Sequence, residues 1–167
     1  MPASEQKVSK NRYQVIPRVL IFIMDGCRVL LLRGNSNKNI WAGKYNGVGG
    51  HLEPGEDVLT AAHRELFEET GLNGLPLVMC GAITVNTTPD TGILLLVFAG
   101  QYSSGEIIPS AEGELEWVAF KDVAHLPVVE DLPAILEQVQ DWRLTGNLFY
   151  GISQYDKEGK LVITFRH

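Results

Sequence analysis

The sequence predicts an α/β fold, α+β in some schemes, in which helices cover a mixed β-sheet in a layered sandwich. Short runs rich in Val, Ile and Leu recur along the chain and alternate with two segments of helical periodicity. At 167 residues and 45% apolar composition, the chain suits one domain with a sizeable core. We expect a flexible tail over residues 1–11 and one domain over residues 12–167.

The first elements are predicted as a β-hairpin and a loop. Residues 18–24 and 28–33 are apolar runs on either side of the turn sequence Asp25-Gly26-Cys27. Residues 34–44 are rich in Asn and Gly and predict a surface loop, which is either a plain connection or a substrate rim carrying Lys38, Trp41 and Lys44.

A glycine-rich segment and a helix follow. Gly47, Gly49 and Gly50 are too many for an ordinary strand, and they predict a backbone that is closely approached or sharply bent. Residues 54–57, Pro-Gly-Glu-Asp, are typical of a helix start. The helix should run to Thr70 and end at the glycine that follows it.

The remaining elements are predicted from apolar runs. We expect strands near residues 75–85, 93–98 and 117–120, a second helix over 132–139, and a last hairpin formed by 148–152 and 161–165.

Three carboxylates of the first helix fall on one face. At 100° per residue, Glu65, Glu68 and Glu69 lie within about a third of the circumference. The adjoining arc should anchor the helix on the sheet through Leu59, Ala62, Leu66 and Phe67.

This face is either a solvated acidic surface or a metal site. By spacing, Arg64 reaches Glu68, whereas Glu65 and Glu69 have no local cation. A bound divalent cation would reverse the repulsion between such carboxylates, and Mg²⁺ commonly joins one or two carboxylates to substrate phosphates. A backbone carbonyl of the glycine-rich turn could supply another oxygen.

The composition limits the classes of partner and the cellular compartment that we expect for this chain. The net charge of −6 and pI near 5.2 give no basic footprint for duplex nucleic acid or an anionic membrane surface. Cys27 and Cys80 lack metal-site spacing and predict buried thiols in a reducing compartment. Because no apolar run approaches the length of a membrane span, we expect a soluble cytoplasmic protein.

The residues in and around this helix resemble a known family motif. The pattern Gly50-x5-Glu56-x7-Arg64-Glu65-Leu66-x-Glu68-Glu69-x-Gly71-Leu72 matches the Nudix box over residues 50–72. The resemblance implies the Nudix α/β/α sandwich and a hydrolase that uses Mg²⁺, with Mn²⁺ as the alternative. It implies that Glu65 and Glu69 bind metal or activate water, that Glu68 assists, and that the Gly50 carbonyl is a ligand. Glu56 and Arg64 would brace the loop against the helix.

The segment from Lys44 to Glu56 is similar to the MutT-like members that hydrolyse oxidised purine nucleotides. There an Asn matching Asn46 lines the base pocket, although Asn46-Gly47 could equally make a simple turn. Glu130 and Asp131 sit where such a member carries a base-reading acidic pair, and ordinary capping is the other interpretation.

Further site residues are expected by position. Glu112 resembles a downstream glutamate that serves as ligand or base, and Glu114 and Glu116 compete for that role. His51 stands where many MutT-like members have Lys, so its phosphate contact could depend on pH. Arg33, Lys38 and Lys44 are the candidate substitutes.

The resemblance implies hydrolysis of a nucleoside triphosphate, including an oxidised purine form, to monophosphate and pyrophosphate. Cleavage of ADP-ribose or a dinucleoside polyphosphate is the first alternative, and a non-catalytic nucleotide-binding module is the second. No SQPWPFPxS-like motif of the NADH-cleaving branch follows the box. The expected partner is a small nucleotide, and the expected state is a monomer or homodimer.

Overall fold

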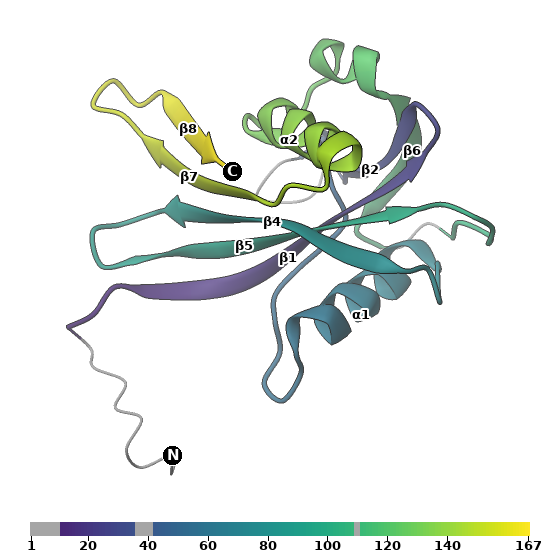
Figure 1. Cartoon of the computed structure of the whole chain (residues 1–167), viewed down its shortest axis with the longest axis horizontal. Coiled ribbons are helices and arrows are strands. Elements are labelled where there is room, and N and C mark those ends of the chain that lie inside the picture. Colours follow the sequence, from purple (N-terminus) through teal and green to yellow (C-terminus); the bar gives the residue numbers. More distant parts are fainter. Residues whose placement is uncertain (1–10, 36–41, 109–110) are drawn as a thin grey trace.

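The computed structural model describes residues 11–35, 42–108 and 111–167 (Figure 1). The predicted tail, apart from Asn11, lies outside the described residues. So do Lys38 and Trp41 of the predicted loop.

Eight strands form one mixed sheet. The order of the strands in the sheet is β3-β2-β1-β5-β4-β7-β8. Strand β6 lies outside this order and also pairs with β2. The pairs β1–β5 and β4–β7 are parallel, and the others are antiparallel. The strands are β1 Gln14–Asp25, β2 Arg28–Gly34, β3 Tyr45–Asn46, β4 Leu77–Asn86, β5 Thr91–Gln101, β6 Gly113–Ala119, β7 Phe149–Tyr155 and β8 Leu161–Arg166. The mixed sheet confirms the predicted fold class.

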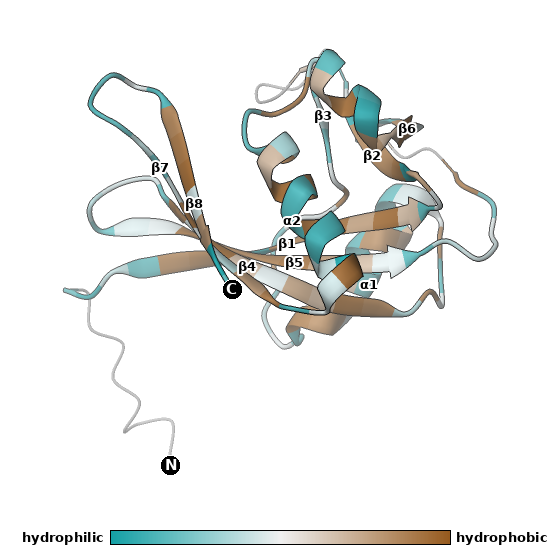
Figure 2. Cartoon of the chain, turned by 45° about the horizontal axis from the view of Figure 1, so that its top comes forward, coloured by the Kyte–Doolittle hydropathy of each residue, from teal (hydrophilic) through white to brown (hydrophobic). Residues whose placement is uncertain are grey.

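Two helices lie on opposite faces of the sheet, α1 Val58–Thr70 and α2 Leu132–Thr145 (Figure 1). Along β1, Leu20, Phe22 and Met24 join the core under α2, whereas Val19, Ile21 and Ile23 join the core under α1. Because both faces are covered, the run is apolar at every position rather than at alternate ones. Figure 2 shows hydrophobic residues concentrated in the middle of the sheet and hydrophilic residues at its turns. In the described part of the chain, no helix is long and apolar enough to cross a membrane.

The structure differs from the predicted elements in a few places. Helix α2 continues six residues past 139, to Thr145, and ends where Gly146 takes the left-handed conformation. Strand β3 and a 3₁₀ helix, η2 Phe120–His125, were not predicted, since both are too short to show periodicity. On α1 the buried contacts come from Ala61, Ala62 and Leu66, so Leu59 and Phe67 are exposed rather than anchoring.

The two cysteines differ from each other. Cys80 is buried, and burial raises the pKa of its thiol to about 12. Cys27 lies in the turn between β1 and β2 and is exposed, which corrects the expectation of two buried thiols.

The ends of α1 fix the position of its carboxylates. The Asp57 side chain accepts hydrogen bonds from the backbone N–H groups of Leu59 and Thr60 at the start of the helix. Gly71 ends it with φ 75° and donates its N–H to the Phe67 carbonyl. Both ends agree with the predicted bounds.

A short segment, Gly47–Leu52, fills a gap in the sheet and is called the bridging segment. Strand β2 pairs with β1 at Met24 and Asp25, and the bridging segment pairs with β1 farther along, through Val48 and His51. Close packing explains its glycines. A Cβ on Gly49 would overlap the Val19 carbonyl, and a Cβ on Gly50 would overlap the Glu65 carboxylate.

Candidate active site

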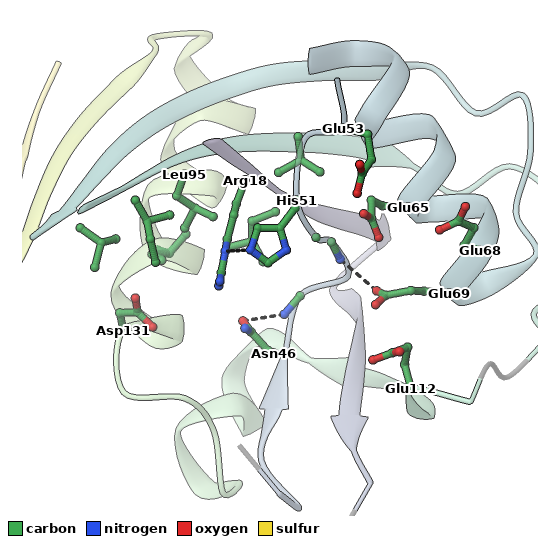
Figure 3. A pocket seen from close by; sticks show the side chains of 18 of the residues that line it. Arg18, Asn46, His51, Glu53, Glu65, Glu68, Glu69, Leu95, Glu112 and Asp131 are labelled. Carbon is green, nitrogen blue, oxygen red and sulfur yellow. Dashed lines mark hydrogen bonds between the residues drawn. The ribbon is translucent and has the colours of Figure 1, made fainter. Parts of the chain in front are cut away.

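A pocket of about 610 Å³ opens around the bridging segment (Figure 3). It reaches both faces of the sheet, since its walls include Val19 from the α1 side and Leu20 from the α2 side. One end carries carboxylates and the other is apolar with a few polar groups. Its volume is in the range of small-molecule sites.

The carboxylate end holds Glu65, Glu68 and Glu69 of α1 (Figure 3). Glu53 and Glu112 line the same pocket. Glu69 is only 7% exposed, and its Oε2 accepts a hydrogen bond of 2.9 Å from the Gly49 N–H. The bridging segment therefore orients this carboxylate directly.

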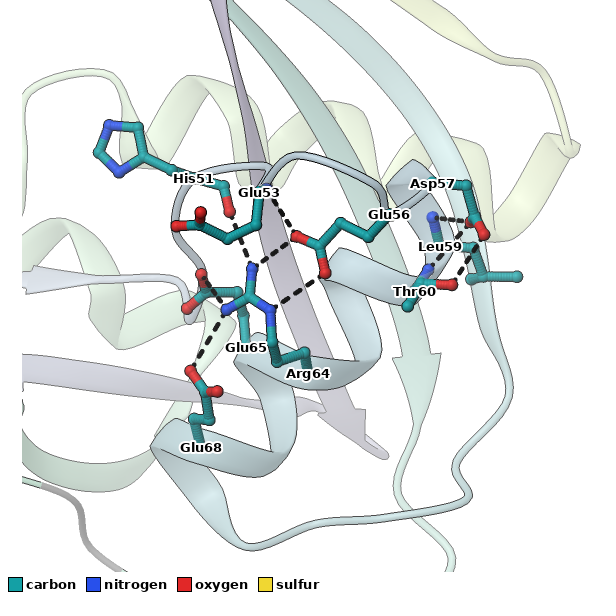
Figure 4. A network of polar contacts seen from close by, with 9 residues as sticks. All are labelled: His51, Glu53, Glu56, Asp57, Leu59, Thr60, Arg64, Glu65 and Glu68. Carbon is teal, nitrogen blue, oxygen red and sulfur yellow. Dashed lines mark hydrogen bonds and ion pairs between the residues drawn. The ribbon is translucent and has the colours of Figure 1, made fainter.

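Arg64 joins the loop and the helix through a network of ion pairs (Figure 4). Its guanidinium donates to both carboxylate oxygens of Glu56, at 2.7 and 3.1 Å, and to the His51 carbonyl at 3.0 Å. The hydrogen bonds from Arg64 hold the pKa of Glu56 below its usual range, and those to Glu56 and Glu65 raise the pKa of Arg64. This geometry suits the bracing role expected of the pair.

Arg64 also corrects one expectation. Its Nη1 lies 2.9 Å from Glu65 Oε1 and 3.3 Å from Glu68 Oε2, so Glu65 does have a local cation. The side chain folds back along its own turn and reaches the adjacent residue, which helical spacing does not anticipate. A metal bound to Glu65 or Glu68 would therefore share these oxygens with Arg64.

The donor set at this end fits a hard divalent cation. Carboxylate oxygens are its preferred ligands, and the Gly50 carbonyl, which accepts the Val19 N–H at 2.9 Å, still has a second lone pair. Among the described residues, no group of three or more His, Cys, Asp or Glu side chains is placed so that it could hold a metal ion by itself. Mg²⁺ does not require one, because it keeps waters and takes substrate phosphates as ligands.

The other end is apolar, with two polar side chains. Asn46 lies on β3, and its Oδ1 accepts the Gly47 N–H at 2.8 Å, so it makes the turn and also lines the pocket. Asp131 precedes α2, and burial raises the pKa of its carboxyl. The walls are aliphatic: Leu20, Val85, Ile93, Leu95 and Ile135.

Several predicted residues lie outside the pocket. The Arg33 guanidinium is 5.8 Å from the centre of the Tyr45 ring, and Glu116 accepts a hydrogen bond from the Tyr45 hydroxyl. Lys44 and Glu130 are exposed outside the pocket. Glu114 on β6 lies opposite Arg33 on β2 in the strand register. Of the three competing glutamates, the structure brings Glu112 to the pocket.

Arg18 was missed by the sequence reasoning. It lines the pocket, and its Nε donates to His51 Nε2 at 3.0 Å (Figure 3). A charged residue at the head of a buried apolar run was the available signal. The aliphatic walls of the pocket carried no sequence signal, because apolar residues on a strand are usually part of the hydrophobic core.

Comparisons with known proteins identify similar chains. The sequence model of the NUDIX domain matches residues 15–139. The chain is 30% identical over 114 residues to the NAD-capped RNA hydrolase NudC of Chromobacterium violaceum, covering 68% of this chain and 40% of that protein. It is 34% identical over 99 residues to the oxidized purine nucleoside triphosphate hydrolase of Danio rerio, covering 59% of this chain and 62% of that protein.

Solved structures have the same fold. The mutator MutT protein from Bacillus halodurans superposes with a TM-score of 0.75 at 25% identity, covering 90% of this chain and 97% of that one. The chain spans less than two thirds of the length of the two curated relatives above.

Proposed function

Because this chain belongs to the NUDIX family, we propose that it is a metal-dependent hydrolase that cleaves a nucleoside triphosphate to monophosphate and pyrophosphate. Purines, including oxidised forms, are the first candidate bases. The observation that carries the proposal is that one pocket has both a carboxylate end and an apolar end, and the apolar end includes the amide of Asn46 and the carboxyl of Asp131. Such a pocket has room for metal-bound phosphates and for a base.

Each end has its own chemistry in this proposal. Glu65, Glu68 and Glu69 would hold the cation, which would supply positive charge to the phosphate oxygens and help to activate the attacking water. Gly49 keeps the Glu69 carboxylate in place through its N–H. Water attacks phosphorus in line as the bond to the leaving phosphate oxygen breaks, and a carboxylate of this group, Glu112 included, accepts the proton.

Base selection falls to Asn46 and Asp131. An amide offers both a donor and an acceptor to a purine edge. The raised pKa of Asp131 favours a carboxyl that can donate as well as accept. The relative named as an oxidized purine nucleoside triphosphate hydrolase supports this choice of base.

A turnover screen tests the proposal. Phosphate and pyrophosphate release would be measured with and without Mg²⁺ over nucleoside triphosphates including oxidised purines, ADP-ribose, NADH and dinucleoside polyphosphates. Glu69→Gln keeps an oxygen for the Gly49 N–H and should lose about 10²-fold or more in turnover. Asn46→Ala should change the preference among bases and leave the metal requirement intact.

The outcomes separate the alternatives. Metal-dependent turnover of a triphosphate that Glu69→Gln loses supports the proposal. Turnover of NADH instead would favour the chemistry named for the NudC relative. Nucleotide binding without turnover would favour a non-catalytic module.

A further inference from the structure

Arg18 is the one Lys or Arg side chain among the described residues that line the pocket. Six carboxyl groups line the same pocket: Glu53, Glu65, Glu68, Glu69, Glu112 and Asp131. A polyanionic substrate therefore meets a strongly negative site. Metal ions would offset this at the glutamate end, and away from them Arg18 carries the positive charge.

The backbone fixes where Arg18 points. Arg18 and His51 are cross-strand partners, and hydrogen bonds from Val19 N to the Gly50 carbonyl and from Leu52 N to the Pro17 carbonyl hold the two segments together. Arg18 Nε donates to His51 Nε2 at 3.0 Å, so the imidazole holds the guanidinium in place. With Nε used, the two terminal nitrogens of the guanidinium remain for a ligand.

The guanidinium lies between the two ends of the pocket. In the view of Figure 3 it projects beside His51, with Glu65 and Glu69 on one side and Asp131 on the other. A nucleotide that places its terminal phosphates at the glutamates and its base at Asn46 would bring the phosphate attached to the nucleoside to this space. A guanidinium can bind two phosphate oxygens at once.

We propose that Arg18, oriented by His51, binds the nucleoside-proximal phosphate of the substrate and so sets the register of the phosphate chain over the glutamates. This inference rests on the proposed function for the direction in which the nucleotide lies. Arg18 contacts the substrate, whereas His51 is a positioning residue that acts through Arg18. In this proposal His51 orients Arg18, whereas a Lys at the same position would contact phosphate directly.

Binding of a monophosphate isolates this contact, because 8-oxo-GMP has the proximal phosphate and no other. Affinities of the full chain for 8-oxo-GMP and 8-oxoguanosine would be measured by calorimetry in EDTA. Arg18→Gln should weaken 8-oxo-GMP binding about 10- to 100-fold and leave the nucleoside unchanged. Arg18→Lys keeps the positive charge but lacks the planar guanidinium that can bind two phosphate oxygens. Its affinity for 8-oxo-GMP should therefore lie between those of the wild type and Arg18→Gln. Arg28→Gln, a cation outside the pocket, is the matched control.

His51→Leu tests the positioning role. It should weaken 8-oxo-GMP binding in the wild-type background and add nothing in the Arg18→Gln background, which a purely structural role would not produce. Urea unfolding would show that each variant is folded. Equal losses for 8-oxo-GMP and 8-oxoguanosine would place Arg18 at the base and overturn the inference.

Turnover separates this inference from the proposed function. With Mg²⁺ and the best triphosphate of the screen, Arg18→Gln should raise KM more than it lowers kcat. An unchanged KM in an active enzyme would refute the role of Arg18 alone. A wild-type protein that cleaves no triphosphate, yet binds 8-oxo-GMP through Arg18, would refute the proposed function alone.

Discussion

At the scale of the residue, Gly50 determines where the Glu65 carboxylate can lie. The carboxylate occupies the volume that a Cβ on Gly50 would need, and it is also held by Arg64. Gly50 therefore allows a helix side chain to approach the backbone that lines the pocket. Glycine is needed at position 50 because it has no side chain, and not because the backbone there takes an unusual conformation.

Gly50→Ala should reduce turnover about 10²-fold, because a small displacement of a catalytic group is costly. Stability should fall less than activity, since the Glu65 side chain can rotate into solvent.

The control is Gly74→Ala, where φ is 72° and a Cβ meets open space, so stability falls by about 1 kcal/mol without loss of activity. Assays with Mg²⁺ and urea unfolding measure both. Wild-type turnover in Gly50→Ala would disprove this account of Glu65.

At the scale of the element, the N-terminal cap of α1 makes the stability of the fold depend on pH. Hydrogen bonds from the Thr60 hydroxyl, the Thr60 N–H and the Leu59 N–H hold the pKa of Asp57 below its usual range. A carboxylate whose pKa is lower in the folded state contributes stability above its ordinary value of 3.8. That contribution is lost as pH falls through the lower folded value.

Asp57→Asn should therefore flatten the acid limb of the stability profile. Asn still caps the helix but does not ionise, so the wild type should lose more stability than the variant between about pH 5 and about pH 2. Urea midpoints followed by circular dichroism across this range measure the difference. Asp141→Asn, at an exposed position on α2, should keep the wild-type slope. Parallel curves for wild type and Asp57→Asn would contradict the capping argument.

At the scale of the whole molecule, the pocket concentrates negative charge. Six carboxyl groups and one guanidinium line it, in a chain whose net charge is −6. Like charges held together destabilise the folded state until a cation binds them. The folded protein should thus be less stable without its metal than with it.

Mg²⁺ should raise the melting temperature of the wild type, corresponding to about 2.7 kcal/mol at a concentration 100 times the Kd. The double variant Glu65→Gln/Glu69→Gln should lose this response and melt no lower than the metal-free wild type. Scanning calorimetry with KCl at matched ionic strength controls for screening. An equal rise with KCl would attribute the effect to screening rather than to a site.

Local chemistry made part of this molecule predictable. The first helix and its carboxylates could be read because Asp57 and Gly71 mark its ends and 3.6-residue spacing groups the glutamates. The apolar end of the pocket could not be read. Val85, Leu95 and Ile135 come from three elements, and they meet only because the sheet order places β4 beside β5 and α2 above them.

The approach of Arg18 to His51 was hidden for a similar reason. The two residues are far apart in sequence and pair through one isolated bridge beside a diverging hairpin. No periodicity reports such a bridge. For the same reason, the charge of Arg33 and Lys44 did not reveal that they lie outside the pocket, where Arg33 pairs with Tyr45 and the Lys44 carbonyl accepts the Gly34 N–H.

The bridging segment lies between two parts of one pocket that have separate supports. The glutamates are carried by the helix under one face of the sheet, and the aliphatic walls belong to the opposite face, so different core contacts support them. Substitutions at Val85 or Leu95 should change the shape of the apolar end while the glutamates of α1 keep their core contacts. Under the proposed function, selection of the base and hydrolysis can therefore change independently of each other.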